Sequence, residues 1–247
     1  MQFIRDGVKN DKETGRKTKY ASMTDDERIK YINTTMETYL TDGTLKQVVA
    51  DGYVLVERTT ESGVRLGIVG LIDLDDYDFD PKKKTLIRAT EGTVISRIPP
   101  RVKIRENAAI ELPHVMLLVD DPIDRQKIDG CQGATQEDAV NIAAVKHGII
   151  EYVYAIRDTL RKLYDTELMQ GGGHIRGYAV EGEAAKQVTE AFAAKQNSCG
   201  GFLFAVGDGN HSLATAKDML GKYQKIRKIH RGAVENSSCK ACSCGNL

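Results

Sequence analysis

The most constraining feature of the sequence is the run FLFAVGDGNHSLATAK at residues 202–217, where a strand pattern passes almost directly into a helix pattern. Five consecutive apolar residues predict a buried strand, and the segment Ser212–Lys228 predicts a helix. Between them, Gly207 and Gly209 predict a tight turn, because glycine adopts a positive φ at little steric cost. This unit favours an α/β or α+β fold, in which a mixed sheet has flanking helices.

Three further segments have helical patterns. Thr24 and Glu27 have the spacing of a capping box, which predicts a helix start, and Asp42-Gly43 predicts its end. Apolar residues recur every three or four positions from Thr135 to Tyr164, which predicts a long helix. The alanine-rich segment Glu183–Gln196 predicts another helix.

Strands and short extended segments are predicted where apolar runs lie between turn signals. These segments are 52–58 and 64–72, which form a hairpin, then 94–98, 102–104, 114–120 and 174–180. We interpret the charged stretch 73–84 as a loop and Pro99-Pro100 as a break between extended segments. The glycine run 171–173 predicts a break before the last of these strands.

Size and composition favour a single globular unit. The chain has 247 residues, of which 41% are hydrophobic, so it can bury a substantial core. We predict one α/β domain over residues 23–230, preceded by a polar lead-in at 1–22. The remaining residues, 231–247, form a cysteine-containing tail that we expect to be disordered.

Charge and cysteine usage limit the function classes. The 35 basic and 35 acidic side chains cancel, which disfavours a general nucleic-acid binder. No apolar run approaches the roughly 20 residues that span a bilayer, and no apolar leader follows the first residue. Five cysteines, an odd number, fit reduced thiols rather than a disulfide framework. We therefore expect a cytoplasmic protein that does not contact membranes.

The turn at residues 207–212 is the first candidate site. A helix that begins after a glycine turn presents unpaired N–H groups and a partial positive charge, which together attract anions. Polar side chains at the same place are Asp208, Asn210, His211 and Ser212. The alternative is a plain strand-to-helix connection in which Asn210 or Ser212 serves as the N-cap. Neither a Walker loop nor a Rossmann fingerprint is present.

A second candidate is the segment 88–106, which concentrates arginine and lysine in a chain of balanced charge. Arg97 and Arg101 offer planar forks of donors that suit phosphate, and Glu91 is a candidate general base among them. The alternative is a solvated strand face. A lesser candidate is the segment 171–178, where the glycine run adjoins His174 and Arg176.

We expect no metal site built from the protein alone. The acidic loop at 73–80 lacks the glycine and the closing glutamate of a calcium-binding EF-hand loop. The three clustered cysteines of the tail, with His230 upstream, do not have the spacing of a zinc site.

Four motifs together give the chain a family resemblance. They are GLIDLDDY, LIRATEGTVISRIPPRVKIRENAAIELPHVMLLVDDP, LYDTELMQGGGHIRGY and FAVGDGNHSLATAK. In this order they resemble the bacterial family called domain of unknown function 1015, over about Asp25 to Lys217. The glycine turn also resembles the D-G-H-H-R element of the ParB/sulfiredoxin-like fold, whose members hold nucleotide phosphates with it. That wider group includes a CTP-dependent switch, a sulfinic-acid reductase and a free-serine kinase.

The resemblance implies roles for several residues. Asp208, Gly209 and His211 match a D-G-x-H pattern, whereas Asn210 and Ser212 stand where the wider group often has histidine and arginine. Glu91 resembles the acidic residue of an E-x-T element in the family. Three residues accompany it there: Thr93, Arg97 and Arg101. Family members are typically longer, so we expect this chain to lack strands that complete the sheet.

The predicted function is to bind a nucleotide, with Mg²⁺ as its candidate companion ion, or another phosphorylated small molecule. Three alternatives stay open: a kinase-like phosphotransferase, a non-catalytic nucleotide-responsive module, and an inactive truncated family member. The predicted catalytic residues are Glu91, His211 and Asp208. The predicted ligand-binding residues are Gly207, Gly209, Asn210, Ser212, Arg97, Arg101, Thr93, His174 and Arg176. The oligomeric state is not predicted.

Overall fold

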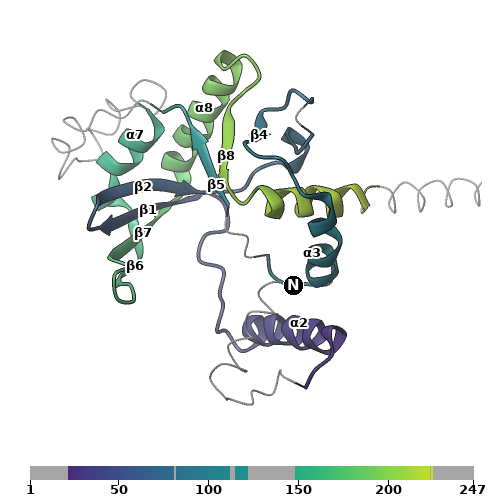
Figure 1. Ribbon diagram of the computed structural model, residues 1–247. Helices are drawn as coiled ribbons and strands as arrows, with labels where there is room; N and C mark the ends of the chain where they lie inside the picture. The colour runs from purple at the N-terminus through teal and green to yellow at the C-terminus, as the bar shows by residue number, and fades with distance from the viewer. Residues whose placement is uncertain (1–21, 81, 112–114, 122–147, 223, 225–247) are drawn as a thin grey trace, which may run out of the picture.

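We describe the protein from a computed structural model that covers residues 22–80, 82–111, 115–121, 148–222 and 224. Within these ranges, five α-helices and two four-stranded sheets make a mixed α/β fold (Figure 1). One sheet is antiparallel and the other is mixed. The prediction of a mixed sheet with flanking helices is therefore confirmed.

The antiparallel sheet, sheet A, has the strand order β2-β1-β7-β6. Its strands are β1 (Tyr53–Thr60), β2 (Gly63–Val69), β6 (Arg161–Glu167) and β7 (His174–Val180). Two helices, α7 (Ile149–Ala155) and α8 (Gly182–Ser198), cover one face of this sheet (Figure 1). The core between them contains Leu55, Val153, Tyr178, Val180 and Val188.

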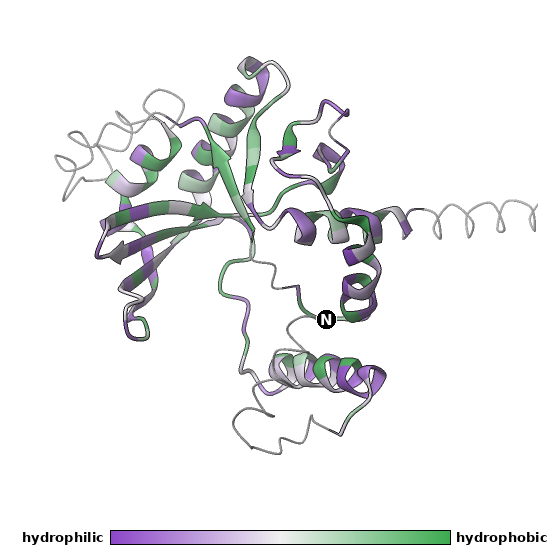
Figure 2. Cartoon of the chain, viewed as in Figure 1, coloured by the Kyte–Doolittle hydropathy of each residue, from purple (hydrophilic) through white to green (hydrophobic). Residues whose placement is uncertain are grey.

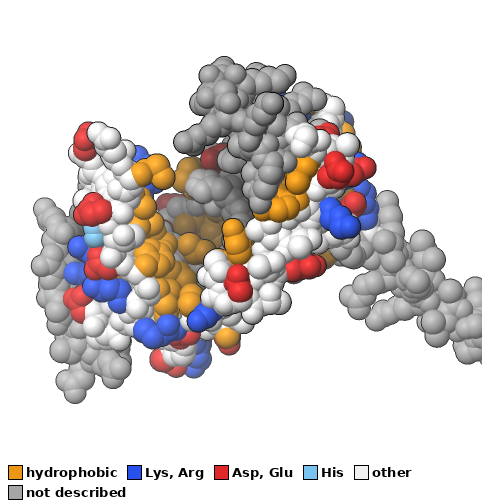
Figure 3. All heavy atoms as spheres, turned by 90° about the horizontal axis from the view of Figure 1, so that it is seen from below, with side chains coloured by type: hydrophobic (Ala, Val, Ile, Leu, Met, Phe, Trp, Pro, Cys, Tyr) orange, Lys and Arg blue, Asp and Glu red, His pale blue; other side chains and the backbone are white. Residues whose placement is uncertain are grey.

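The opposite face of sheet A is more open. Val69 lies opposite Val54 on the neighbouring strand, and it is exposed, as is Tyr164. The Tyr164 ring lies over Gly177, where a Cβ atom would meet the ring at 2.2 Å. Apolar side chains gather over this side of the molecule beside a hollow (Figure 3).

The mixed sheet, sheet B, has the strand order β3-β4-β8-β5. Its strands are β3 (Tyr77–Asp78), β4 (Ile87–Ala89), β5 (Met116–Val119) and β8 (Phe204–Asp208). β3, β4 and β8 run parallel, and β5 pairs with β8 in the antiparallel direction. Hydrophobic residues dominate β5 and β8 (Figure 2), as expected for strands that help to form a core.

Two helices follow the strands of sheet B. The helix at 210–222 begins directly after β8 and packs its Leu213 against Tyr77, Ile87 and Val206. The helix α3 (Ile98–Arg105) packs on it through a small apolar cluster of Ile98, Val102 and Ala214.

The first described helix, α2 (Asp25–Thr41), lies beyond α3 from the sheets (Figure 1). Its N-terminus has the predicted capping box, in which the Thr24 side chain accepts from the Glu27 N–H and the Glu27 carboxylate accepts from the Thr24 N–H. Ile29 is its single buried residue, so α2 contributes little to the core.

Asp121 connects the end of β5 with the helices of sheet A. Its carboxylate accepts hydrogen bonds from the N–H groups of Ile149 and Ile150 at 3.0 and 2.9 Å, which caps α7. The Lys195 ammonium on α8 lies 3.3 Å from the same carboxylate. On the neighbouring turn of α8, the ring of Phe192 lies 5.6 Å from that of Phe204 in β8, so an aromatic contact joins this helix to sheet B as well.

Several predicted elements are confirmed. They are the hairpin, the helix after Thr24, the strand at 174–180, the helix now seen as α8, and the extended segment that contains β5. The strand at 202–206 exists but covers 204–208, and the helix after it begins at residue 210 rather than at 212. The predicted lead-in and tail, apart from residue 22, lie outside the described residues.

The prediction of extended segments at 94–98 and 102–104 is wrong. Residues Ile95–Arg97 form a 3₁₀ turn, η2, which leads into α3. Pro99 and Pro100 lie in the first turn of α3, where a missing N–H costs nothing because that position has no intrahelical acceptor. The prolines therefore start a helix instead of separating strands.

The prediction of one helix from Thr135 to Tyr164 is confirmed over Ile149–Ala155 and wrong after it, and residues 135–147 lie outside the described part. The helix α7 ends at Ala155, a 3₁₀ turn η3 (Arg157–Thr159) follows, and β6 begins at Arg161. From Arg161 onward, pairing with β7 makes the chain a strand, although the apolar residues still recur at the spacing typical of a helix. The loop predicted at 73–84 also contains a 3₁₀ turn, η1 (Leu74–Asp76), and the short strand β3.

No helix among the described residues is long and apolar enough to cross a bilayer.

The turn between β6 and β7 allows a matched test of backbone packing. Gly171 and Gly173 both have positive φ, at 77° and 72°, but only Gly173 is crowded, because a Cβ atom there would lie 2.0 Å from the Thr59 carbonyl oxygen. Gly171→Ala should lower the free energy of unfolding by about 1 kcal/mol through backbone strain alone. Gly173→Ala should lower it by about 3 kcal/mol, because overpacking adds to the strain. Urea denaturation measures both values, and equal losses would contradict the predicted close approach.

Candidate functional site

The candidate site lies where two parallel strands end. β4 and β8 pair in register, with Ile87 opposite Phe204 and Ala89 opposite Val206. The loop 90–94 after β4 and the turn at Gly209 after β8 therefore emerge at the same edge of sheet B. In open α/β sheets, ligands bind outside the carboxyl ends of parallel strands, which makes this edge the natural place for a site.

Asn210 joins these two segments and is only 3% exposed. Its Oδ1 accepts a hydrogen bond from the Thr90 N–H at 3.3 Å, and its Nδ2 donates to Thr90 Oγ1 at 3.4 Å. The Thr90 hydroxyl in turn donates to the Val206 carbonyl at 2.5 Å. The Asn210 side chain thus holds the loop against the turn from inside the protein.

Tyr77 adds the third parallel strand to this arrangement. Its hydroxyl donates to the Asn210 carbonyl at 3.5 Å. Burial, reinforced by the neighbouring charge of Asp78, raises the pKa of Tyr77 to about 12, so the phenol stays protonated and can act as this donor.

Gly209 is the point at which the strand becomes a helix. Its φ is +92°, a conformation that favours glycine, and its carbonyl accepts from the N–H groups of Ser212 and Leu213 at 2.9 and 3.0 Å. Gly209 therefore occupies the N-cap position, and neither Asn210 nor Ser212 does. The N–H groups of Asn210 and His211 have no acceptor within the helix, as expected of a first turn. The Asp208 carboxylate lies beside them and accepts from the Gly209 N–H at 2.7 Å.

His211 connects the helix start to the loop after β4. Its Nε2 accepts a hydrogen bond from the Val94 N–H at 3.3 Å, so this nitrogen carries no proton and the proton of the neutral ring is on Nδ1. Nδ1 lies 4.0 Å from a carboxylate oxygen of Glu91. The His211 side chain is 18% exposed and that of Glu91 is 62% exposed, so the pair opens to solvent on the Glu91 side. The structure thus brings together Glu91 and His211, which come from two separate candidate segments of the sequence.

Thr93 lies in the same loop and carries an unsatisfied group. Its Oγ1 is buried and has no hydrogen-bond partner among the residues that the structure describes. Buried hydroxyl groups in native proteins are nearly always paired, so an exception at a candidate site calls for an explanation.

Arg97 and Arg101 follow the loop, in η2 and α3. Arg101 Nη1 donates to the Arg97 carbonyl at 3.1 Å, and within the described residues neither guanidinium forms a hydrogen bond or ion pair with the glycine turn. Arg105 does reach the helix: its Nη1 donates to the Ser212 carbonyl at 3.0 Å while its other nitrogens bind Glu111.

His174 and Arg176 lie in β7 of sheet A rather than at the glycine turn. His174 Nε2 lies 2.9 Å from Asp165, and Arg176 bonds both Asp165 and the buried Glu57, at 3.3 and 2.7 Å. These contacts form a charge network across three strands, which is separate from the edge of sheet B.

Three residues of the site were not among the predicted site residues. They are Thr90, Tyr77 and Arg105, which hold the turn in place by the contacts given above. Thr90 had a sequence signal, since it precedes Glu91 in the motif RATEGT, but nothing in the sequence pairs Tyr77 with residue 210.

At this edge, a metal ion would need oxygen atoms from a bound small molecule in addition to those of the protein. Within the described residues, no group of three or more histidine, cysteine, aspartate or glutamate side chains is placed to hold a metal ion. Asp208 and Glu91 nevertheless supply a carboxylate from each of the two segments.

Comparison with known proteins identifies a family. The sequence model described as "Protein of unknown function (DUF1015)" matches residues 13–238, which is most of the chain. No curated protein and no solved structure matches.

The buried amide of Asn210 gives a testable consequence for stability. Asn210→Ala should lower the free energy of unfolding by about 1–3 kcal/mol, because it removes a buried side chain and leaves the part-buried Thr90 N–H without its acceptor. Asn197→Ala, at an exposed position of α8, is the control and should change stability by less than about 0.5 kcal/mol. Thermal and urea denaturation of both variants measure the difference, and a neutral Asn210→Ala would contradict the structural role.

Proposed function

The chain belongs to the family described as Protein of unknown function (DUF1015), and from the contacts at its glycine turn we propose that it binds the phosphate group of a nucleotide or other phosphorylated small molecule. The proposal depends on one observation. Hydrogen-bond donors from the helix start and from the loop after β4 meet at one edge of sheet B.

The donors have the character that phosphate requires. The N–H groups of Asn210 and His211 belong to the first turn of a helix, where the helix dipole favours negative charge. The His211 ring carries its proton on Nδ1, so it offers one more donor at the open side of the site. The Thr93 hydroxyl is buried without a partner in the described part of the chain, and a ligand oxygen would satisfy it.

A carboxylate at the open side of the site makes the proposal more specific. The Glu91 side chain is 62% exposed and its charge would repel a bare phosphate, so the ligand should arrive with a divalent cation. Mg²⁺ commonly binds through one or two carboxylates together with substrate phosphates, and it retains several waters. A Mg²⁺-nucleotide fits this donor set better than a free phosphate ion does.

The sequence likeness adds support. The D-G-x-H pattern at Asp208–His211 is similar to an element with which ParB/sulfiredoxin-like proteins hold nucleotide phosphates. In our proposal, Arg97 and Arg101 supply charge that attracts the ligand, because both lie just after the loop that carries Thr93.

Binding without transfer is our first choice for the mode of action. His211 Nε2 already accepts the Val94 N–H, so it is not available as a base. Phosphoryl transfer is the second candidate, and the observation that favours it is the exposed carboxylate of Glu91, which could accept a proton from an attacking hydroxyl. Product formation from a bound nucleotide and an acceptor separates the two modes.

The binding proposal can be tested by titration. Isothermal calorimetry of the full chain with ATP, CTP, GTP and pyrophosphate, each with and without Mg²⁺, should give saturable binding that depends on Mg²⁺. His211→Ala should weaken that binding at least tenfold, because it removes a donor to a charged group. His174→Ala, in sheet A, should leave it unchanged. Absence of binding for every ligand, or equal affinities of the two variants, would refute the phosphate site.

Thr93→Val distinguishes a ligand contact from a structural role. Valine has nearly the shape of threonine, so the unbound protein should keep its stability or gain up to about 1 kcal/mol as the unpaired hydroxyl is removed. The affinity for the Mg²⁺-nucleotide should fall severalfold. Thr166→Val, at an exposed position of β6, is the control for the hydroxyl-to-methyl change. A large loss of stability with unchanged affinity would show that the hydroxyl serves the fold alone.

A further inference from the structure

A second feature adjoins the glycine turn, on one face of sheet B. Leu117 and Val206 face the core that includes the helix at 210–222. Because neighbouring residues of a strand point to opposite faces, Met116 and Leu118 lie on the other side of the sheet. They are 49% and 53% exposed. The strand β5 is therefore apolar on both of its faces (Figure 2), although only one of them is buried in the core.

Met116, Leu118 and Gly207 together form an apolar shelf on this face. A Cβ atom on Gly207 would lie 3.1 Å from Leu118 Cγ and 3.1 Å from Met116 Cε, so both side chains lie beside this glycine. Gly207 is itself exposed and adds no side chain to the shelf. An exposed apolar surface bordered by polar groups is typical of a ligand or partner site.

The apolar shelf lies next to the donors of the proposed phosphate site. Met116 is opposite Asp208 in the antiparallel pair, and Gly209, the N-cap of the helix, follows directly. Gly207 and Gly209 are two residues apart, so at most about 7 Å separates their Cα atoms. A ligand that is held by its phosphate at the helix start can therefore extend over the apolar shelf.

The chemistry of the apolar shelf selects the part of the ligand that it would contact. Its side chains carry no charge and no hydrogen-bond donor, so they do not favour a second phosphate group. They suit the uncharged face of a ring, and the methionine sulfur in particular makes favourable contacts with aromatic rings. A nucleotide carries such a ring, because every base has a flat π-face.

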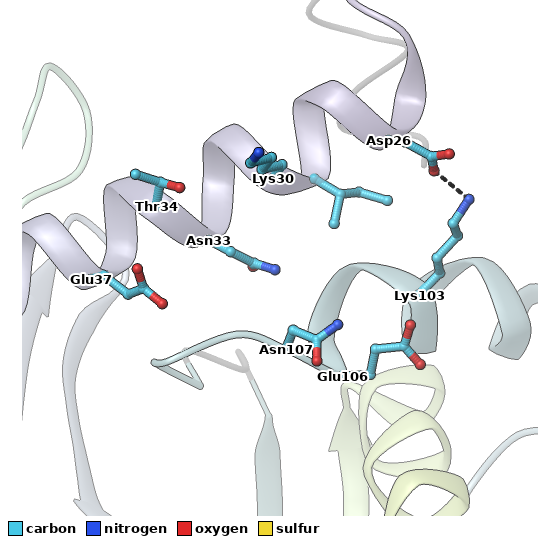
Figure 4. A pocket seen from close by; sticks show the side chains of 9 residues that line it. Asp26, Lys30, Asn33, Thr34, Glu37, Lys103, Glu106 and Asn107 are labelled. Atoms are coloured by element: carbon cyan, nitrogen blue, oxygen red, sulfur yellow. Dashed lines mark ion pairs between the residues drawn. The ribbon is translucent and has the colours of Figure 1, made fainter.

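The cavity between α2 and α3 shows no comparable preference, although its volume is about 390 Å³ (Figure 4). Asp26 is paired with Lys103, and Glu106 has a partner of its own. The charges of Lys30 and Glu37 then balance. This lining selects neither a charge nor an apolar group, whereas the apolar shelf selects a ring.

We propose that the apolar shelf binds the base of a nucleotide whose phosphate the glycine turn holds. The face of the base lies on Met116 and Leu118. This inference rests on the proposed phosphate binding, and it makes the ligand a nucleotide rather than another phosphorylated compound.

Calorimetry with and without a base on the ligand tests the proposal. The full chain is titrated with ATP, CTP and GTP and with tripolyphosphate, each with Mg²⁺, and at least one nucleotide should bind about tenfold more tightly than tripolyphosphate. Leu118→Ala should weaken nucleotide binding about fivefold, because it removes apolar contact area, and should leave tripolyphosphate binding unchanged. Val64→Ala, at a similarly exposed position of β2, is the control and should change neither.

A fluorescent variant locates the base directly. The sequence contains no tryptophan, so Leu118→Trp introduces a single indole into the apolar shelf. The nucleotide should quench its emission and bind about threefold more tightly than to wild type, because the indole offers a larger stacking surface. Tripolyphosphate should leave the emission unchanged. Val64→Trp is the matched control and should respond to neither ligand. Circular dichroism melts establish that each variant is folded.

Three results would overturn this inference while the phosphate site stands. They are equal affinities for tripolyphosphate and every nucleotide, equal nucleotide affinities of Leu118→Ala and wild type, and an emission of Leu118→Trp that the nucleotide does not change. Emission that follows the protein concentration instead of the ligand would assign the apolar shelf to a second copy of the chain, and would also overturn it. Absence of binding by every ligand, tripolyphosphate included, would refute the phosphate site itself, and the inference would fall with it.

Discussion

The structure around the candidate site depends on one buried amide. Asn210 follows β8 and holds Thr90, which follows β4, while its carbonyl accepts the Tyr77 hydroxyl from β3. Polar contacts within the protein therefore connect all three parallel strands to the turn at Gly209. A buried amide is costly unless its hydrogen bonds are made, so these contacts strongly favour one arrangement of the edge. The positions of Gly209, His211 and Thr93 all follow from it.

This constraint explains why the edge suits a ligand with both phosphate and metal. Asn210 holds the loop after β4 against the turn at Gly209. The start of the helix at that turn contributes N–H donors, and Asp208 and Glu91 contribute carboxylates. Either set alone would favour ligands of one sign, cations for the carboxylates and anions for the donors. Together they match a ligand in which positive and negative charges are adjacent, because each protein group then has an opposite charge within reach.

The local elements were largely predictable from the sequence, whereas their pairing was not. The capping box at Thr24, the hairpin and the strand-glycine-helix unit depend on residues close together in the chain, and all three are present. The apolar spacing predicts helix as far as Tyr164, and only pairing with β7 makes residues from Arg161 onward a strand. Proline at a helix start gives the same local signal as proline in a turn, so the sequence does not tell a break at Pro99 from the start of α3.

At the site, the structure brings Glu91 and His211 within 4.0 Å of each other. The prediction of His174 and Arg176 as ligand-binding residues at the same site assumes a proximity that the strand order does not provide.

The helix α3 fixes the loop of Thr93 to the helix that begins at the glycine turn. It follows that loop after the single turn η2. Ile98 and Val102 pack on Ala214, and Arg105 donates to the Ser212 carbonyl, so α3 is held against the same helix that presents His211. A substitution within α3 would therefore disturb the edge of sheet B without touching a ligand bound there.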